Sequence, residues 1–396
     1  MDLIKQKLKK NKFIKLIYEM LFQRPIYNFF GADHSKKVLF SYSTYHFNKR
    51  KYNKHSNYRE SKKIAEIFDR LGYRVDIINN DREHAGSLKD YDVIFGEGIP
   101  MYQAIDNKIA ATTICYATGS HPWQCTNASL SRVVEFYNTY QVSALSSARI
   151  KDHRWGLAAS MSDAVICIGN EVTKGTFTRN GSKTVLRLDP TFIERADSTS
   201  ILKERNMTKA KQQALWFGSY GLLHKGLDIA IEAFRGRPDW SLHVCGYTDA
   251  EATLLSSIKI PENVHIHGFI DVLSDSFKEI AIKCGFVILP SCSEGTATAV
   301  LTAVGSGAMI PIVTAECGVD IDCFGFNIEL SKMSVIETLI KIESMSVSQL
   351  NHMAIQANDA VRKRYSFANF EKNIESHLIE LLANRKTKCG AVEKEL

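Results

Sequence analysis

The chain has 396 residues, of which 45% are hydrophobic and 23% charged, a composition that excludes a disordered chain and a membrane channel. Its length predicts two domains, because one hydrophobic core rarely serves more than about 250–300 residues. The formal net charge of +7 is concentrated at one end, since six lysines lie in the first fifteen residues; the rest is nearly balanced and gives no indication of a nucleic-acid partner.

The apolar residues and the cysteines both favour a cytoplasmic protein. No apolar run approaches the roughly 20 residues that span a bilayer. Lysines interrupt the N-terminal stretch where a signal peptide needs its apolar region. The nine cysteines are scattered and not paired at short spacing, which is typical of a reducing compartment without a disulfide framework.

Residues 1–30 predict a basic amphipathic helix. Apolar side chains such as Leu3, Leu8 and Leu21 recur near helical spacing, and lysines fill the positions between them. Such a helix can lie on an anionic bilayer surface or pack on its own domain, and the sequence leaves both open. In the first case residues 1–25 would make the chain peripheral to the inner face of the cell membrane.

Residues 31–190 predict a first doubly wound α/β domain. Short β-branched strands alternate with helical stretches such as 59–71, 128–140 and 146–161, the pattern of a parallel sheet with crossover helices. The expected strands are residues 38–42, 74–78, 92–95, 112–116, 163–168 and 184–187.

A polar stretch over residues 191–212 predicts a linker, and residues 213–365 predict a second doubly wound domain. Two consecutive domains of this kind imply a cleft, and parallel sheets bind ligands beyond the carboxyl ends of their strands. A C-terminal helix over residues 366–384 and a disordered tail over residues 385–396 complete the expected order. The strands expected in the second domain are residues 214–217, 240–244, 264–267, 286–289 and 310–313.

The stretch Ser291–Thr298 predicts an anion site. It follows an apolar strand and passes directly into a helix, so several free backbone N–H groups point at one spot. Glu294 stands beside that spot, and a carboxylate accepts hydrogen bonds from sugar hydroxyls. Lys225 follows another strand and precedes another helix, where its ammonium group and the helix N-terminus both attract phosphate. Together the two turns predict a sugar-nucleotide site.

Five runs in the second domain, with their order and spacing, resemble the nucleotide-binding half of the GT-B glycosyltransferases of family 4, also called glycosyl transferases group 1. A less specific similarity covers the first domain, so the resemblance spans most of the chain after residue 36. Residues 364–370 are similar to the segment that crosses back to the first domain in that fold. The five runs are residues 216–219, 225–228, 263–269, 289–291 and 293–295.

The resemblance implies two Rossmann-like doubly wound domains that face a central cleft, with a C-terminal helix crossing back. It implies transfer of a sugar from a nucleotide-diphosphate donor to a glycan or lipid-linked acceptor of a cell surface, with no cofactor or bound metal and with retention at the anomeric carbon. It gives catalytic roles to Glu294, Lys225 and His121. The donor-binding residues that it implies are Gly218, Ser219, Lys225, Phe269, Ser293, Glu294, Gly295, Thr296, Ala297, Thr298 and Thr302.

Two positions depart from the family pattern. Thr302 stands where the family has a second glutamate that binds the ribose, and a shorter, uncharged side chain must bind ribose more weakly or through water. Ser219 stands where the family has an arginine, so one cationic partner of the diphosphate is missing. In the first domain Ser43 and Thr44 follow a strand end and are candidates for acceptor contact.

The sequence leaves two alternatives open and disfavours two others. A nucleotide-sugar epimerase of the same fold would bind the same donor and need no acceptor, and a non-catalytic homologue would have lost turnover. His265 and His267 face one side of an expected strand, but a zinc site needs further ligands that are not spaced nearby. A nicotinamide enzyme is disfavoured, because no Gly-x-Gly-x-x-Gly run follows a strand.

Overall fold

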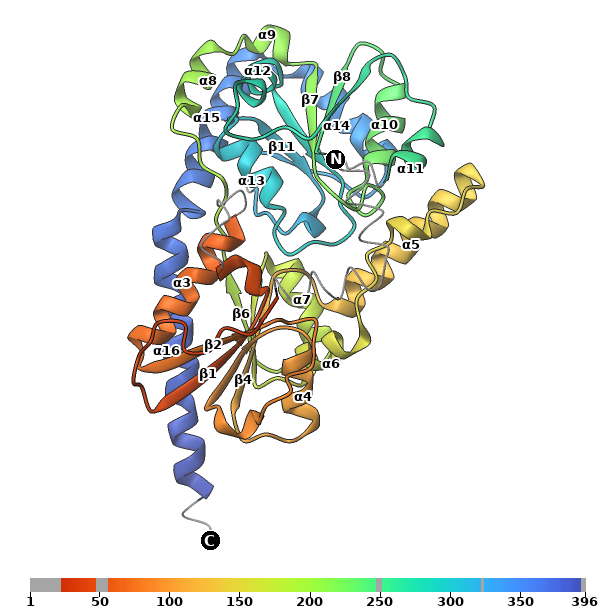
Figure 1. Ribbon diagram of the computed structural model, residues 1–396. Helices are drawn as coiled ribbons and strands as arrows, with labels where there is room; N and C mark the ends of the chain where they lie inside the picture. The colour runs from red at the N-terminus through yellow and green to blue at the C-terminus, as the bar shows by residue number, and fades with distance from the viewer. Residues whose placement is uncertain (1–22, 48–55, 247–250, 322–323, 393–396) are drawn as a thin grey trace.

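The computed structural model describes residues 23–47, 56–246, 251–321 and 324–392. The expected basic helix falls mostly on residues 1–22, which lie outside this part of the chain, so the helix and its membrane contact stay predictions. Figure 1 shows two layered α/β domains, one above the other, with a helical C-terminal segment along one side of both.

The first domain is built on a six-stranded parallel sheet in the order β2-β1-β3-β4-β5-β6, which is the expected doubly wound arrangement. The strands are β1 (Lys36–Ser41), β2 (Tyr73–Ile78), β3 (Val93–Gly96), β4 (Thr112–Ala117), β5 (Ala164–Ile168) and β6 (Val185–Leu188). The helices are α3 (Ser56–Arg70), α4 (Ile99–Asp106), α5 (Pro122–Tyr140), α6 (His153–Met161) and α7 (Glu171–Arg179), with 3₁₀ turns at Thr44–Phe47, Leu88–Asp90 and Leu145–Ser147.

The second domain repeats the plan with the strand order β12-β11-β10-β7-β8-β9. The strands are β7 (Gln213–Phe217), β8 (Ser241–Cys245), β9 (Val264–Gly268), β10 (Phe286–Leu289), β11 (Ile310–Val313) and β12 (Phe326–Asn327), the last too short to leave a sequence pattern. The helices are α10 (Leu227–Arg235), α11 (Ala252–Ser256), α12 (Asp275–Lys283), α13 (Thr298–Gly305), α14 (Lys332–Ser344) and α15 (Val347–Arg364), with a 3₁₀ turn at Ala315–Cys317.

Several segments differ from the sequence-based expectation; the helix expected over residues 146–161, for example, begins only at His153. Ile26, placed in the expected N-terminal helix, instead forms an antiparallel bridge with Ile77 through backbone hydrogen bonds of 2.9 and 2.8 Å. The expected linker contains α8 (Ser198–Glu204) and α9 (Met207–Ala210), whose apolar side chains join the core of the second domain. The final helix, α16 (Phe367–Val392), continues past residue 384, where we expected disorder.

The C-terminal helices connect the two domains. α15 packs on α13 of the second domain, whereas Phe370, Ile374 and Leu378 of α16 are buried in the core of the first. Between them Arg364 binds Asp189 at 2.8 Å and Asp320 at 2.7 Å, so one guanidinium joins the end of the first domain to the second. Figure 1 shows this segment running along the side of both sheets.

Candidate active site

A left-handed glycine places Lys225. Gly226 has a φ of +63° and forms the N-cap of α10. A Cβ atom at this position would lie 2.1 Å from the backbone oxygen of Pro290, so only glycine lets the turn lie against the end of β10. The backbone N–H of Cys292 then donates to the oxygen of His224 at 2.9 Å. The two strand-turn-helix loops predicted from the sequence are therefore joined.

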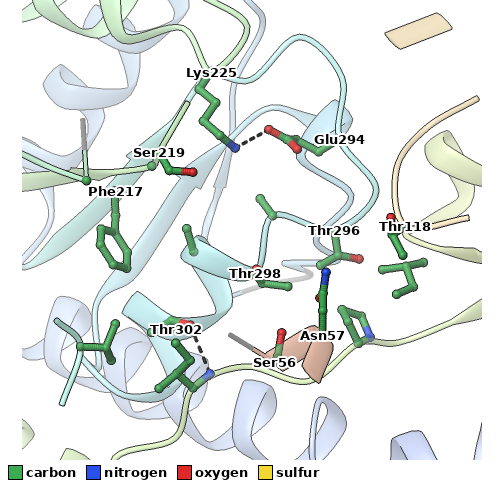
Figure 2. Close-up of a pocket in the computed structure, with 18 of the residues that line it drawn as sticks. Ser56, Asn57, Thr118, Phe217, Ser219, Lys225, Glu294, Thr296, Thr298 and Thr302 are labelled. Atoms are coloured by element: carbon green, nitrogen blue, oxygen red, sulfur yellow. Dashed lines mark hydrogen bonds and ion pairs between the residues drawn. The ribbon is translucent and has the colours of Figure 1, made fainter. Parts of the chain in front are cut away.

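Lys225 and Glu294 form an ion pair at the contact between these loops. Lys225 Nζ lies 2.5 Å from Glu294 Oε1, and Ser291 Oγ donates to the same oxygen at 3.1 Å. The absence of a side chain at Gly218 leaves room for the lysine, because a Cβ atom there would lie 2.9 Å from Lys225 Cδ. Figure 2 shows the pair at one edge of the pocket.

Arg149 approaches the same carboxylate from the first domain. It lies between the 3₁₀ turn at Leu145–Ser147 and α6, with Nη1 3.3 Å from Glu294 Oε2. Its Nη2 donates to the backbone oxygen of Tyr220 at 2.6 Å, which anchors the guanidinium. No sequence motif points to this residue, which lies 145 positions from Glu294 along the chain.

The two cations control the ionisation of Glu294. Burial alone would raise the pKa of its carboxyl group, but the charges of Lys225 and Arg149 outweigh that effect and hold the pKa well below its usual range. Glu294 is therefore ionised at neutral pH. Its negative charge is compensated by two positive charges, so the group of three carries a net charge of +1.

A cavity of about 360 Å³ lies between the two domains and contains all three charged groups in its lining. Ser56 and Asn57 of α3 face Thr296 and Thr298 across it (Figure 2). Phe269, with 75% of its surface exposed, stands at the lining where a planar ring could stack on it. Nine of the expected donor-binding residues line the cavity: Gly218, Ser219, Lys225, Phe269, Glu294, Thr296, Ala297, Thr298 and Thr302.

Residues 211–323 match the family model for Glycosyl transferases group 1. The chain carries a glycosyltransferase domain within a GT-B fold. The match agrees with the resemblance seen in the second domain, and the solved structures confirm the predicted architecture. No curated protein matches the chain in sequence.

Solved glycosyltransferase structures share the fold over nearly the whole chain. Sucrose-phosphate synthase from Thermosynechococcus elongatus aligns with a TM-score of 0.60 at 12% identity, covering 88% of this chain and 100% of that one. HepE of Anabaena, in complex with UDP and glucose, aligns with a TM-score of 0.54 at 13% identity and the same coverage. A glycosyltransferase from Rickettsia africae ESF-5 gives 0.53 at 11% identity, covering 89% and 100%.

Two of the expected donor-binding residues make contacts between the domains. Ser293 Oγ lies 2.5 Å from Ser120 Oγ of the first domain, and Thr173 Oγ1 donates to the backbone oxygen of Gly295 at 3.1 Å. A Cβ atom on Gly295 would lie 2.7 Å from the backbone oxygen of Thr118. Neither Ser293 nor Gly295 lines the interdomain cavity, although Ser293 lines the second cavity described below.

His121 is also corrected by the structure. Its side chain is fully buried and lines neither of the two cavities described here. Nδ1 accepts from the backbone N–H of Trp123 at 3.3 Å, as the N-cap of α5, and Nε2 lies 3.1 Å from Ser160 Oγ. Burial lowers its pKa to about 4, so the ring is neutral. The expected sugar contact fails because α5 begins there. Ser43 and Thr44 likewise line neither cavity described here.

Backbone N–H groups for an anion are available at one of the two turns. In the turn before Lys225, the buried carboxylate of Glu251 already accepts from the N–H groups of Gly221 at 2.7 Å and Leu222 at 3.0 Å. At the start of α13, Ala297 is the N-cap without a side-chain cap. The N-terminus of α13 therefore remains as the anion-attracting helix end.

Thr302 stands where the family pattern has a glutamate, but its side chain makes a different contact. It lines the cavity, but its Oγ1 accepts from the backbone N–H of Ile193 at 3.4 Å (Figure 2). The hydroxyl oxygen thus holds the segment around Ile193, which joins the two domains. Its hydrogen can still be donated to a ligand.

A second cavity of about 400 Å³ adjoins the first. It shares the lining residues Thr118, Arg149 and Glu294 with the first cavity, and its other walls include Glu97 and Trp155 of the first domain. The Arg149–Glu294 pair therefore stands at the boundary between two adjoining cavities.

The described residues contain neither a candidate membrane-spanning helix nor a candidate metal site. Within these ranges, no helix has the length and apolar character that crossing a membrane requires. Nor do three or more His, Cys, Asp or Glu side chains of the described segments come together in a way that could hold a metal ion. His267 instead pairs with His243, with 2.9 Å between their ring nitrogens.

Proposed function

We propose that this glycosyltransferase moves a sugar from a nucleotide-diphosphate donor bound in the interdomain cavity to a glycan or lipid-linked acceptor. One observation carries the proposal: Lys225 and Arg149 converge on Glu294 at the wall of a cavity between two doubly wound domains. A diphosphate needs positive charge, and a sugar needs hydrogen-bond acceptors. The two cations and the carboxylate supply the positive charge and the hydrogen-bond acceptors at one place in the cavity.

In this proposal the two cations bind the diphosphate. Lys225 provides a point charge and Arg149 a planar fork that matches phosphate oxygens. Arg149 would thereby supply the positive charge that Ser219, in place of the family's arginine, does not. When the diphosphate takes over both cations, Glu294 is released to accept hydrogen bonds from the sugar hydroxyls. The N-terminus of α13 adds further attraction for the phosphate oxygens.

We further propose that transfer proceeds with retention and without a metal ion. The bond from the anomeric carbon to the phosphate oxygen breaks, the acceptor oxygen bonds to the same face of that carbon, and the departing phosphate oxygen takes the acceptor proton. Lys225 and Arg149 stabilise the growing negative charge on the leaving group, a role that a divalent ion plays in other enzymes.

Two observations support the choice of substrates. HepE, which shares the fold, was solved in complex with UDP-glucose, so a uridine donor is the first to test. The cavity that adjoins the donor cavity favours a transferase over an epimerase, because an epimerase needs no room for a second substrate. A cytoplasmic location and a membrane contact through residues 1–25 remain parts of the proposal.

Release of nucleoside diphosphate tests the proposal. Purified protein is incubated with the UDP, GDP, ADP and dTDP forms of common sugars, with and without a cell extract as the source of acceptor. We expect release from one donor, increased by the extract. No release from any donor under either condition would contradict the enzyme assignment. Conversion of the donor sugar to its epimer would support the epimerase instead.

A further inference from the structure

Glu97 is held in the second cavity by a tight turn at the end of β3. Gly96 has a φ of +120° and Gly98 a φ of +88°. A Cβ atom on Gly96 would lie 2.1 Å from the backbone oxygen of Ser41, and one on Gly98 would lie 2.2 Å from that of Asn80. Two glycines therefore let the turn pass against the ends of β1 and β2. This fixes the backbone from which the Glu97 side chain reaches the cavity wall.

Hydrogen bonds on both backbone groups of Glu97 make this turn rigid. Its N–H donates to the oxygen of Ser41 at 3.0 Å, and its own oxygen accepts from Ser41 Oγ at 2.6 Å. The side chain has fewer partners: Oε1 accepts from Asn80 Nδ2 at 3.2 Å, and the backbone N–H of Thr118 adds a second contact. A carboxylate has about four acceptor positions, so it can accept more hydrogen bonds from the cavity.

Burial leaves the carboxyl group of Glu97 partly protonated near neutral pH. Burial raises its pKa to about 7, with Lys151 opposing the shift and Asp81 adding to it. A group in this state accepts hydrogen bonds from neutral hydroxyls without needing a cationic ligand. Its ionised form repels a phosphate.

Trp155 of α6 gives the same cavity an apolar surface. Its ring lines the same cavity, and Lys151 Nζ lies 5.4 Å from the ring centroid. An aromatic ring beside hydrogen-bonding groups suits a molecule that has both an apolar face and polar edges. Sugar rings have this character: their C–H groups form a face and their hydroxyls point outward.

We propose that the second cavity binds the acceptor as a sugar ring, with hydroxyls donating to Glu97 and the C–H face packed on Trp155. The inference rests on the proposed transfer reaction and deepens it, because it assigns the acceptor a chemical class. The shared wall of Arg149 and Glu294 would place this sugar directly beside the donor sugar. Glu97 on the wall favours a hydroxyl over a phosphate at its end of the cavity, because a carboxylate accepts hydrogen bonds and repels an anion.

Saturation-transfer NMR with methyl glycosides tests this site. The probes are methyl glycosides of glucose, galactose, mannose and N-acetylglucosamine, and glycerol 3-phosphate as an anionic probe, each with and without UDP. The variants are Glu97→Gln, which keeps the side-chain shape, and Trp155→Ala. Glu83→Gln is the matched control, because its side chain is 70% exposed and lines neither cavity. Thermal unfolding of each variant shows whether it is folded.

We expect at least one glycoside to receive saturation in the wild type and in Glu83→Gln. Its dissociation constant should rise at least about 10-fold in Glu97→Gln, the size expected for one lost charge-assisted hydrogen bond. Absence of any glycoside signal, unchanged affinity in Glu97→Gln, or tighter binding of glycerol 3-phosphate than of every glycoside would overturn the inference. UDP binding in the same samples reports on the donor site. Loss of UDP binding would therefore count against the proposed function, and loss of glycoside binding alone would count against this inference.

Discussion

Arg149 of the first domain contacts Glu294 of the second, with 3.3 Å between Nη1 and Oε2. The same carboxylate pairs with Lys225 at 2.5 Å. Two cations from opposite sides of the cleft thus share one anion in the unliganded protein. A diphosphate that enters the cavity competes with Glu294 for both. Donor binding and the release of the sugar-binding carboxylate are therefore expected to be one event.

Replacing Arg149 by glutamine should weaken nucleoside-diphosphate binding about 10-fold or more, because a charge-assisted bidentate contact is lost. Affinity for the nucleoside alone should not change. Isothermal titration calorimetry of both ligands measures the effect, and Arg154→Gln on nearby α6 is the control. Equal losses for nucleoside and diphosphate would mean that Arg149 supports the fold and not the phosphates.

Lys225→Ala and Glu294→Ala should each reduce turnover 100-fold or more, the range for losing one preorganised electrostatic partner. The two variants should differ in binding. Lys225→Ala removes a phosphate partner and weakens the diphosphate, whereas Glu294→Ala removes a competitor for the cations and should bind free nucleoside diphosphate at least as well as the wild type. Steady-state kinetics and calorimetry check both; normal turnover in either variant contradicts the site.

Gly295→Ala should separate the two domains. A Cβ atom there would lie 2.7 Å from the backbone oxygen of Thr118 and 2.8 Å from that of Ile168, and backbone atoms cannot rotate away. We expect turnover to fall at least about 10-fold, because the halves of the site are misplaced. Small-angle scattering should show a larger radius of gyration, while circular dichroism stays unchanged. An unaltered radius with full activity would refute this role.

The features that could be predicted from the sequence are those determined by interactions between residues close together in the chain. The strand-turn-helix loops around Lys225 and Glu294 follow from local patterns, and the parallel order of the sheets follows from the alternation of strands and helices. Arg149 could not be predicted, because its role comes from a contact between domains. His121 was misplaced because a residue just past a strand end can face the cleft or cap the next helix, and here it caps α5.

The same limit explains Ser293 and Gly295. Their turn was identified correctly, but which of its faces the first domain covers depends on how the domains meet. Short sequence motifs carry no information on how two domains pack against each other. Glu97 lies between two glycines that follow an expected strand, a local pattern that is typical of a constrained turn.

Glu60 gives the protein a pH-dependent stability. This buried carboxylate of α3 accepts from the N–H of Thr191 at 2.6 Å and from its hydroxyl at 2.7 Å. Burial raises its pKa to about 7, although these hydrogen bonds oppose the shift. Between about pH 4.5 and 7 the folded state therefore holds a proton that the unfolded state has released, and the contribution of Glu60 to stability falls as pH rises.

Comparison with Glu60→Gln isolates this contribution, because shifts in buried histidines cancel in the difference. The free energy of unfolding of the wild type minus that of Glu60→Gln should fall by up to about 1.4 kcal/mol per pH unit through this window. Above about pH 7.5 the difference should level off. Urea denaturation from pH 5 to 8 measures it; a difference that is constant with pH would show that Glu60 ionises normally.

The most direct test of the diphosphate site is calorimetric titration of uridine, UMP and UDP into the wild type and into a Lys225→Ala, Arg149→Gln double variant. Guanosine, adenosine and thymidine series follow if uridine shows no binding. We predict that in one series the wild type binds the diphosphate at least about 10-fold more tightly than the monophosphate, and that the double variant loses this preference. Equal affinity of the wild type for the monophosphate and diphosphate in every series would contradict the account.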